Sequence, residues 1–128
     1  MIEAYLNIQK IRMDSRLRYE IDVPDNIRQY AFPPMLLQPL VENAVRHGLE
    51  PKEEGGEIII SAAAQDHLLT IKVADTGLGF SDFDKAGVGI ANVRERLTLL
   101  FGEKGRLFLE ENKPCGVRAT MEVPISDL

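Results

Sequence analysis

Hydrophobic and polar residues alternate in some parts of the chain and recur at helical spacing in others, and each pattern predicts an element. From Leu17 to Val23 every second residue is hydrophobic, which is the period of a strand with one buried face. From Ile90 to Leu100 hydrophobic residues recur at the spacing of a helix. The same reasoning predicts helices at residues 1–13, 33–47 and 90–101, and strands at 17–23, 57–64, 68–75, 105–111 and 116–124.

Prolines, glycines and polar residues mark the ends of these elements. Pro33 and Pro34 suit the first turn of a helix, and Gly48 stands where a glycine commonly ends one. The polar residues 65–67 predict a turn between two strands. Residues 76–88 contain glycines and acidic residues without a hydrophobic period, so we predict a loop there. A loop of that length in a small domain is usually functional or mobile.

The order helix, strand, helix, two strands, helix, two strands predicts an α/β two-layer sandwich. In this fold class a mixed, mostly antiparallel sheet of about five strands carries about three helices on one face. No repeat, low-complexity tract or interior boundary divides the sequence, so residues 1–128 are predicted to form a single domain. With 45% hydrophobic residues, a chain of this length can bury a substantial core.

Charge and composition exclude several classes of function. The formal net charge of −5 argues against nucleic acid or an anionic membrane as the main partner, because both normally need a basic face. No hydrophobic run approaches the roughly 18–20 residues of a membrane span, and the N-terminus lacks a signal-peptide pattern. The single cysteine, Cys115, excludes an internal disulfide and is interpreted as an incidental turn residue. We therefore expect a soluble, cytosolic chain.

Three short motifs carry the functional signal, and the first is LQPLVENAVRHG at residues 37–48. On a helical wheel Asn43 and His47 lie one turn apart, at the edge of the hydrophobic face. An asparagine carbonyl oxygen is a good ligand for Mg²⁺, which takes oxygen donors and keeps several waters. Arg46, on the neighbouring solvent side, could reach a phosphate. Taken alone, Asn43 is more often a structural hydrogen-bonding residue and His47 an ordinary helix-end histidine, so both interpretations stay open.

The second motif is DTGLGF, at residues 75–80, where Asp75 has the strand parity of the buried hydrophobic residues before it. A carboxylate directed into the interior is costly unless it is well hydrogen-bonded. One interpretation is an aspartate that caps its own loop. The other is an acceptor for an adenine amino group, because Gly77 and Gly79 let the backbone approach a flat ligand closely.

The third motif is GVGIAN, at residues 87–92, where Gly87 and Gly89 run directly into the predicted helix. Free N–H groups and the helix dipole at such a junction favour phosphate. A glycine pair alone is weak evidence. It follows a loop, which excludes a dinucleotide-binding fingerprint, and the chain has neither a P-loop nor a Ser/Thr/Tyr kinase signature. Together the three motifs suit a nucleoside triphosphate.

As a set, these motifs resemble the N box and the two glycine boxes of the catalytic, ATP-binding domain of sensor histidine kinases. That domain belongs to the GHKL (HATPase_c) superfamily, which also contains gyrase, the Hsp90 chaperones and the mismatch-repair protein MutL. The phrases PPMLLQPLVENA and GVGIANVRERL are similar to those of LytS-like kinases. The similarity covers essentially all of the chain. It implies the Bergerat-type ATP-binding fold, with ATP and Mg²⁺ as cofactors.

For the N box, the resemblance implies that Asn43 binds Mg²⁺ and that Arg46 and His47 lie near the phosphates. Many superfamily members carry a polar residue four positions before this asparagine, often the base or a second Mg²⁺ ligand. Pro39 stands there in this chain, as is usual in LytS-like members. Glu42 is the candidate substitute, although it lies about 100° from Asn43 on the wheel. The catalytic candidates are therefore Asn43, Glu42 and His47.

For the first glycine box, the resemblance implies that Asp75 accepts a hydrogen bond from the adenine amino group, with Gly77 and Gly79 alongside. Relatives often have a threonine at the position of Val117, where it commonly helps to bind adenine through water. Thr120 has the opposite strand parity and cannot simply take its place.

For the second glycine box, the resemblance implies that Gly87 and Gly89 hinge a lid over the ATP and support its phosphates. Residues 76–88 would form this ATP lid. Asn92 matches the family pattern and is counted with the cofactor-binding candidates, without an assigned chemical role.

The function implied is transfer of the γ-phosphoryl group of Mg-ATP to a histidine on a separate domain, mostly by positioning and charge neutralisation. His47 belongs to the N box and His67 to a predicted turn, so neither is expected to be the acceptor. Residues 1–15 would form the N-terminal helix that joins an upstream dimerisation and phosphoacceptor domain, outside these 128 residues. A response regulator would receive the phosphoryl group. The chain would be a cytoplasmic domain of an inner-membrane sensor protein, without direct membrane contact.

Two other functions stay open at this point. An anti-sigma-factor-type serine kinase uses the same fold, but the LytS-like wording of the N box and of residues 87–97 disfavours it. A nucleotide-binding module without catalysis is the alternative from another class, and Pro39 and Val117 are the residues that favour it.

Overall fold

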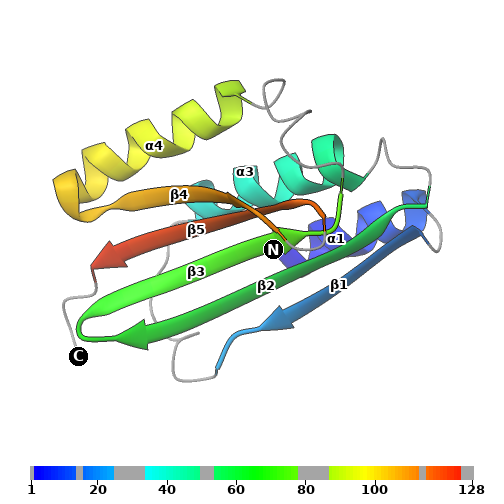
Figure 1. Cartoon of the computed structure of the whole chain (residues 1–128), viewed down its shortest axis with the longest axis horizontal. Coiled ribbons are helices and arrows are strands. Elements are labelled where there is room, and N and C mark those ends of the chain that lie inside the picture. The colour runs from blue at the N-terminus through cyan, green and yellow to red at the C-terminus, as the bar shows by residue number, and fades with distance from the viewer. Residues whose placement is uncertain are drawn as a thin grey trace.

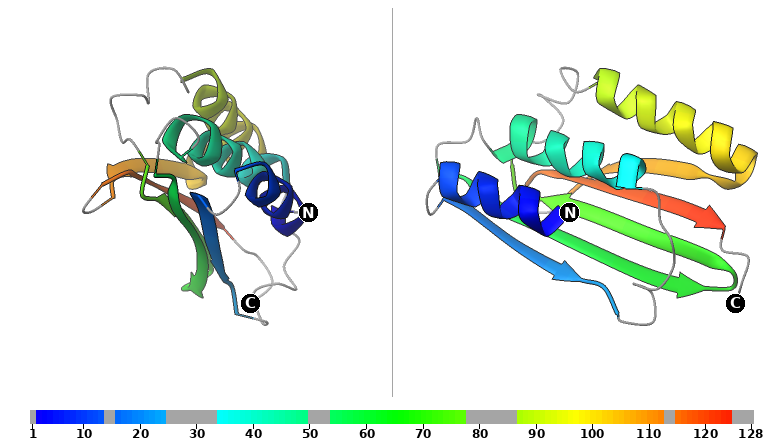
Figure 2. Two further views of the ribbon diagram at one scale, coloured as in Figure 1. Left: turned by 90° about the vertical axis from the view of Figure 1, so that its right-hand side faces the viewer. Right: turned by 180° about the vertical axis from the view of Figure 1, so that it is seen from behind.

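The computed structural model shows one five-stranded sheet with helices packed on one of its faces (Figures 1 and 2). It describes residues 2–13, 16–24, 34–49, 54–77, 87–112 and 115–124. The elements in chain order are α1 (Ile2–Arg12), β1 (Leu17–Asp22), α3 (Pro34–Asn43), η2 (Ala44–Leu49), β2 (Gly56–Gln65), β3 (Leu68–Asp75), α4 (Gly87–Phe101), η4 (Gly102–Lys104), β4 (Arg106–Glu111) and β5 (Val117–Pro124). The predicted two-layer α/β sandwich is therefore confirmed.

The strands lie in the order β1-β2-β3-β5-β4, so β3 is the central strand. β1 pairs with β2 in parallel, and every other neighbouring pair is antiparallel. A parallel pair needs a crossover connection, which α3 supplies on the covered face. The turn between β2 and β3 has positive φ at both Asp66 and His67, as a two-residue type I′ hairpin requires. The predicted polar turn is therefore confirmed.

The core lies between the covered face of the sheet and the helices. Along β3, Leu69, Ile71 and Val73 are buried and alternate with more exposed residues. α4 contributes the buried Val93 and Leu97 to the same core, at the helical spacing seen in the sequence. The remaining core comes from every layer, including Leu6, Leu17, Leu36, Leu40, Val41, Ile58, Ile60, Leu107, Met121 and Val123.

At the edge of the sheet, polar contacts hold α1 on β1. Tyr19 Oη donates a hydrogen bond to Asn7 Oδ1 at 2.6 Å. Lys10 Nζ lies 5.8 Å from the centre of the same tyrosine ring, within the range of a cation–π contact. Two other side chains of α1, Ile8 and Ile11, are exposed. No helix in the described part of the chain is long and apolar enough to cross a membrane.

The helix predicted at residues 33–47 differs from the structure at its C-terminal end. The α-helical part ends at Asn43, and residues Ala44–Leu49 continue as the π-helix η2. Gly48 therefore lies within a helical segment and does not end it, so the predicted glycine stop was wrong. Continuing the helix carries Leu49 into the core, where it is fully buried. Burial of this leucine stabilises the extra turn more than glycine disfavours it.

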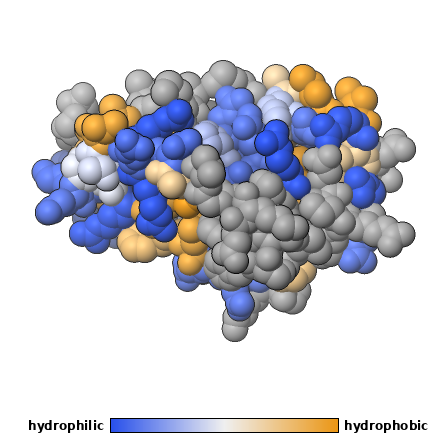
Figure 3. All heavy atoms as spheres, turned by 90° about the horizontal axis from the view of Figure 1, so that it is seen from above, coloured by the Kyte–Doolittle hydropathy of each residue, from blue (hydrophilic) through white to orange (hydrophobic). Residues whose placement is uncertain are grey.

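The start of α4 also differs from the prediction. The helix begins at Gly87, so Gly87 and Val88 belong to α4 and not to the predicted loop of residues 76–88. Residues 78–86 lie outside the described residues. Near the other end of the helix, Leu99 and Leu100 are exposed. Figure 3 shows hydrophobic side chains exposed at several places on the side of the molecule that is seen from above.

The burial pattern predicts that alanine substitution at two leucines of α4 has very different effects on the free energy of unfolding. Leu97 is 1% exposed and Leu99 is 78% exposed. Leu97→Ala should lower the free energy of unfolding by about 2–5 kcal/mol, because it removes buried methyl groups and leaves a cavity. Leu99→Ala should change it by no more than about 0.5 kcal/mol. Urea denaturation of both variants measures this, and equal losses would contradict the packing of α4.

Candidate functional site

The three sequence motifs meet at one end of the molecule (Figures 1 and 2). The C-terminal end of α3, the C-terminal end of β3 and the N-terminal end of α4 all lie toward this end. α3 packs against α4, and η2 contacts β2 and β3. The topology therefore gathers residues that are more than thirty positions apart in the sequence.

Asp75, the last residue of β3, is the buried acidic group of this region, at 4% exposure. Its Oδ1 atom accepts hydrogen bonds from the backbone N–H of Gly77 at 2.8 Å and of Val117 at 3.4 Å. Such charge-assisted bonds compensate for the loss of water around a buried carboxylate. The predicted inward parity is confirmed, and so is the interpretation that the aspartate caps its own loop.

Residues between β4 and β5 also form hydrogen bonds with the end of β3. Asn112 Nδ2 donates a 2.8 Å hydrogen bond to the main-chain carbonyl of Asp75. Cys115 Sγ lies 3.3 Å from the carbonyl oxygen of Thr76 in a weaker bond of the same kind. Gly116 has a φ of +100°, and a Cβ there would lie 2.9 Å from Asp75 Oδ1 and closer still to its carbonyl oxygen. Sequence reasoning missed these contacts because it treated the segment only as a turn.

On the other side, Thr76 joins the end of β3 to the start of β2. Its backbone N–H donates to the carbonyl of Glu57 at 3.1 Å, and its Oγ1 accepts from the Glu57 N–H at 2.9 Å. A Cβ at Gly56 would collide with Thr76 Oγ1 and would lie 2.8 Å from Leu49 Cδ2. Because Gly56 has no side chain, η2 can pack directly against the ends of β2 and β3 beside Asp75.

Asn43, the last residue of α3, is half-buried, as its predicted place at the edge of the hydrophobic face requires. Its Nδ2 atom is fully buried and has no hydrogen-bond partner among the described residues. Leaving a buried amide group unpaired costs about 1–3 kcal/mol. Buried polar groups without a protein partner are exceptional, and a ligand that supplies the partner is one explanation.

The neighbours of Asn43 are placed differently from one another. Glu42 is half-buried and accepts a 3.1 Å hydrogen bond from Gln38 Nε2, one turn earlier on α3. Arg46 is exposed on η2. The side chain of His47 lies outside the described part of the structure. The predicted alignment of Asn43 with His47 assumed about 100° per residue. The π-helical winding of residues Ala44–Leu49 changes that angle, and the alignment of the two side chains stays a prediction.

The glycines and Asn92 complete the predicted set. Gly77 is buried beside Asp75, whereas Gly79 lies outside the described residues. Gly87 and Gly89 fall in the first turn of α4, and Asn92 is exposed on the same helix. Within the described ranges, no cluster of three or more His, Cys, Asp and Glu side chains could hold a metal ion. A cation here would therefore need the Asn43 amide together with oxygen atoms of a ligand and water.

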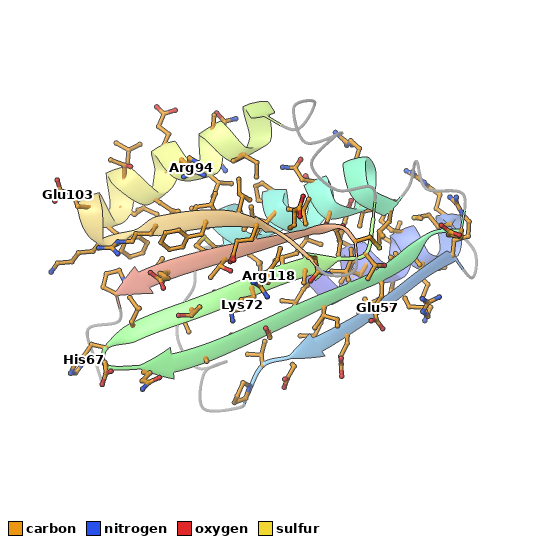
Figure 4. The ribbon with its side chains drawn as sticks, in the orientation of Figure 1. Glu57, His67, Lys72, Arg94, Glu103 and Arg118 are labelled. Carbon is orange, nitrogen blue, oxygen red and sulfur yellow. The ribbon has the colours of Figure 1, made fainter. Side chains whose placement is uncertain are left out.

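Two other features lie apart from this site. His67 is at the tip of the β2–β3 hairpin, at the opposite end of the sheet from Glu57 (Figure 4). A hollow of about 360 Å³ lies between α4 and β4, and Arg94 spans it by donating a 3.0 Å hydrogen bond to the carbonyl of Leu107. None of the predicted site residues lines this hollow.

Comparison with known proteins identifies the family. Residues 32–127 match the family model described as histidine kinase-, DNA gyrase B-, and HSP90-like ATPase. The chain belongs to this ATPase family. The relatives include the sensor histidine kinase YesM of Bacillus subtilis, which is 32% identical over 97% of this chain and 22% of its own length. The sensor histidine kinase BtsS of Escherichia coli is 32% identical over 98% of this chain and 23% of its own. The sensor protein LytS of Bacillus subtilis is 26% identical over 99% and 24%.

Solved structures share the fold of this ATPase domain. The histidine kinase AdeS of Acinetobacter baumannii has a TM-score of 0.67 at 21% identity, over 98% of this chain and 64% of that one. The catalytic domain of histidine kinase ThkA has a TM-score of 0.69 at 16% identity, over 94% and 86%. The chain thus corresponds to the ATP-binding catalytic domain of sensor histidine kinases. It spans less than a quarter of the length of YesM, BtsS and LytS.

The close approach of Gly116 to Asp75 predicts that alanine substitution costs more unfolding free energy at Gly116 than at Gly102. Gly102 and Gly116 both have positive φ, but nothing lies within 4 Å of a Cβ at Gly102. Gly102→Ala should cost about 1–2 kcal/mol of unfolding free energy, because of the left-handed backbone alone. Gly116→Ala should cost about 1–3 kcal/mol more, because the methyl group meets the Asp75 carbonyl. Urea denaturation compares the two, and similar losses would contradict the contact.

Proposed function

We propose that this domain binds Mg-ATP and transfers the γ-phosphoryl group to a histidine on a separate domain. The observation that carries the proposal is Asp75, a buried carboxylate held by backbone N–H groups at the end of the central strand. A carboxylate only accepts hydrogen bonds, so it favours the amino group at C6 of adenine over the oxygen at C6 of other purines. Gly77, and Gly79 beyond it, would let the ring lie close to the backbone.

Asn43 would hold Mg²⁺ at the phosphate end of the ligand. The fit rests on its half-buried amide, one atom of which lacks a partner among the described residues. A half-turn of the amide exchanges its oxygen and nitrogen, and the oxygen is the atom that Mg²⁺ prefers. The ion would neutralise charge on the phosphates. Few protein ligands are needed, because Mg²⁺ keeps several waters and takes phosphate oxygens.

The remaining residues would bind the phosphates and close the site. Arg46 and His47 on η2 would approach the phosphates from one side, and the first turn of α4, with Gly87 and Gly89, from the other. Residues 76–88 would act as the lid. Glu42, the residue before Asn43, is the candidate base, and the hydrogen bond from Gln38 holds its carboxylate on α3.

The acceptor histidine would belong to an upstream dimerisation and phosphoacceptor domain, with a response regulator as the final recipient. The names of the relatives support this, since YesM, BtsS and LytS are sensor proteins several times longer than this chain. Residues 1–15 would join the two domains, and the exposed Ile8 and Ile11 of α1 offer an apolar contact. We also propose that the parent is an inner-membrane sensor and that this domain lies in the cytoplasm.

Transfer of label from ATP tests the function. The 128-residue chain is incubated with γ-labelled ATP, Mg²⁺ and the isolated phosphoacceptor domain of the same parent protein. Acid-labile label on a histidine of that domain supports the proposal. Binding of ATP without transfer would favour a module without catalysis, and acid-stable label on a serine would favour the serine-kinase alternative.

Asp75→Asn should lower the affinity for ATP by about 10- to 150-fold, because it removes the charge from a hydrogen bond while keeping the shape of the side chain. Isothermal titration calorimetry measures the affinity. Asp66→Asn, in the exposed hairpin at the far end of β3, is the control and should leave it unchanged. Equal affinities for the two variants would refute the adenine contact.

Asn43→Ala and Asn43→Asp should abolish Mg²⁺-dependent transfer and leave the fold intact, because the amide is assigned to the ion and not to a protein partner. The labelled-ATP assay reports transfer, and circular dichroism reports the fold. Asp66→Asn, in the exposed hairpin at the far end of β3, should retain transfer. Full transfer by both Asn43 variants would exclude Asn43 from the site.

A further inference from the structure

We propose that Asn112 is a positioning residue for adenine recognition, which it serves by fixing the main chain of Asp75. The proposal rests on the adenine contact assigned to Asp75 above. Asn112 follows the last residue of β4, and its Nδ2 donates a 2.8 Å hydrogen bond to the carbonyl oxygen of Asp75. The two residues are 37 positions apart in the sequence.

This bond crosses over an intervening strand. β4 pairs only with β5, and β5 lies between β4 and β3. The side chain of Asn112 can reach β3 because Gly116, at the start of β5, carries no Cβ at the crossing point. The backbone of Asn112 is itself fixed there, since its N–H donates to the carbonyl of Gly116 at 3.0 Å. The backbone N–H and the side-chain amide of Asn112 therefore each donate a hydrogen bond, and the amide is directed at the end of β3.

The Asp75 backbone pairs with Ile58 of β2 on one side, whereas the pairing of β3 with β5 ends at Ala74 and Arg118, so Asn112 holds the side of Asp75 that faces β5. The Gly77 N–H belongs to the chain segment that follows Asp75, so it moves with the strand end. The Val117 N–H lies 3.4 Å from Oδ1, beyond the usual range of a strong N–H···O bond. Asn112 supplies a short bond from another part of the sheet to the Asp75 backbone. Binding groups need placement to within about 0.5 Å, and this bond contributes to it by holding the main chain that carries the carboxylate.

The consequence is specific to one part of the ligand. If Asn112 positions Asp75, its loss weakens only the contact with the 6-amino group of adenine. A nucleotide without that group does not use the Asp75 contact, so its affinity should not depend on Asn112. Purine riboside triphosphate is such a nucleotide, because it is ATP with hydrogen in place of the amino group. If Asn112 had a purely structural role, its loss would lower the affinity for both nucleotides by the same factor.

Calorimetric titration of the 128-residue chain with the two nucleotides tests this. The wild-type chain should prefer ATP, and Asp75→Asn should reduce that preference. Asn112→Ala should lower ATP affinity by about 3- to 10-fold, the range for loss of one neutral hydrogen bond, and leave purine riboside triphosphate unchanged. Asn112→Asp should do the same or more, because it replaces the donor with an acceptor facing a carbonyl. Asn7→Ala should change neither affinity.

The comparison stays decisive if a variant is partly unfolded, because the ratio of two affinities is measured on one preparation. An equal loss for both nucleotides, or an unchanged ATP affinity in Asn112→Ala, would overturn the positioning role while the Asp75 result stands. A wild-type chain that binds both nucleotides equally would instead overturn the adenine contact of Asp75, and the role of Asn112 with it.

Discussion

A negatively charged side chain buried at the end of the central strand is the constraint on which this structure depends. Burial of the Asp75 carboxylate is costly unless backbone N–H groups replace the hydrogen bonds that water made. The chain supplies them from the segment after β3 and from the start of β5. Gly116 must lack a side chain for β5 to come so near, and Asn112 then reaches the same backbone. The position of the carboxylate, the strand order and the conformation of the turn are thus coupled.

A glycine also allows close packing at the start of β2. Gly56 allows Thr76 and Leu49 to approach the strand, and the paired bonds between Thr76 and Glu57 extend the sheet by one residue beyond β3. The motifs of this ATPase family are distant in sequence, and close packing at glycines helps to bring the strand and helix ends together.

Features that depend on local spacing could be predicted from the sequence. The inward parity of Asp75 follows from the period of two in β3, and the partial burial of Asn43 follows from the helical period of α3. Features that depend on strand order could not. Nothing local indicates that β5 inserts between β3 and β4, yet that order brings Asn112 next to Asp75. The π-helical turn was missed because a wheel with a fixed angle per residue cannot represent it.

The π-helical turn also makes the length of this segment critical. η2 holds more residues per turn than an α-helix, so the chain between Asn43 and Leu49 is longer than an ordinary helix needs. Deletion of one residue there would favour regular winding, but it would also rotate every later side chain and withdraw Leu49 from Gly56. Asn43 and the strand ends are therefore connected by a segment whose residue count is fixed by its winding.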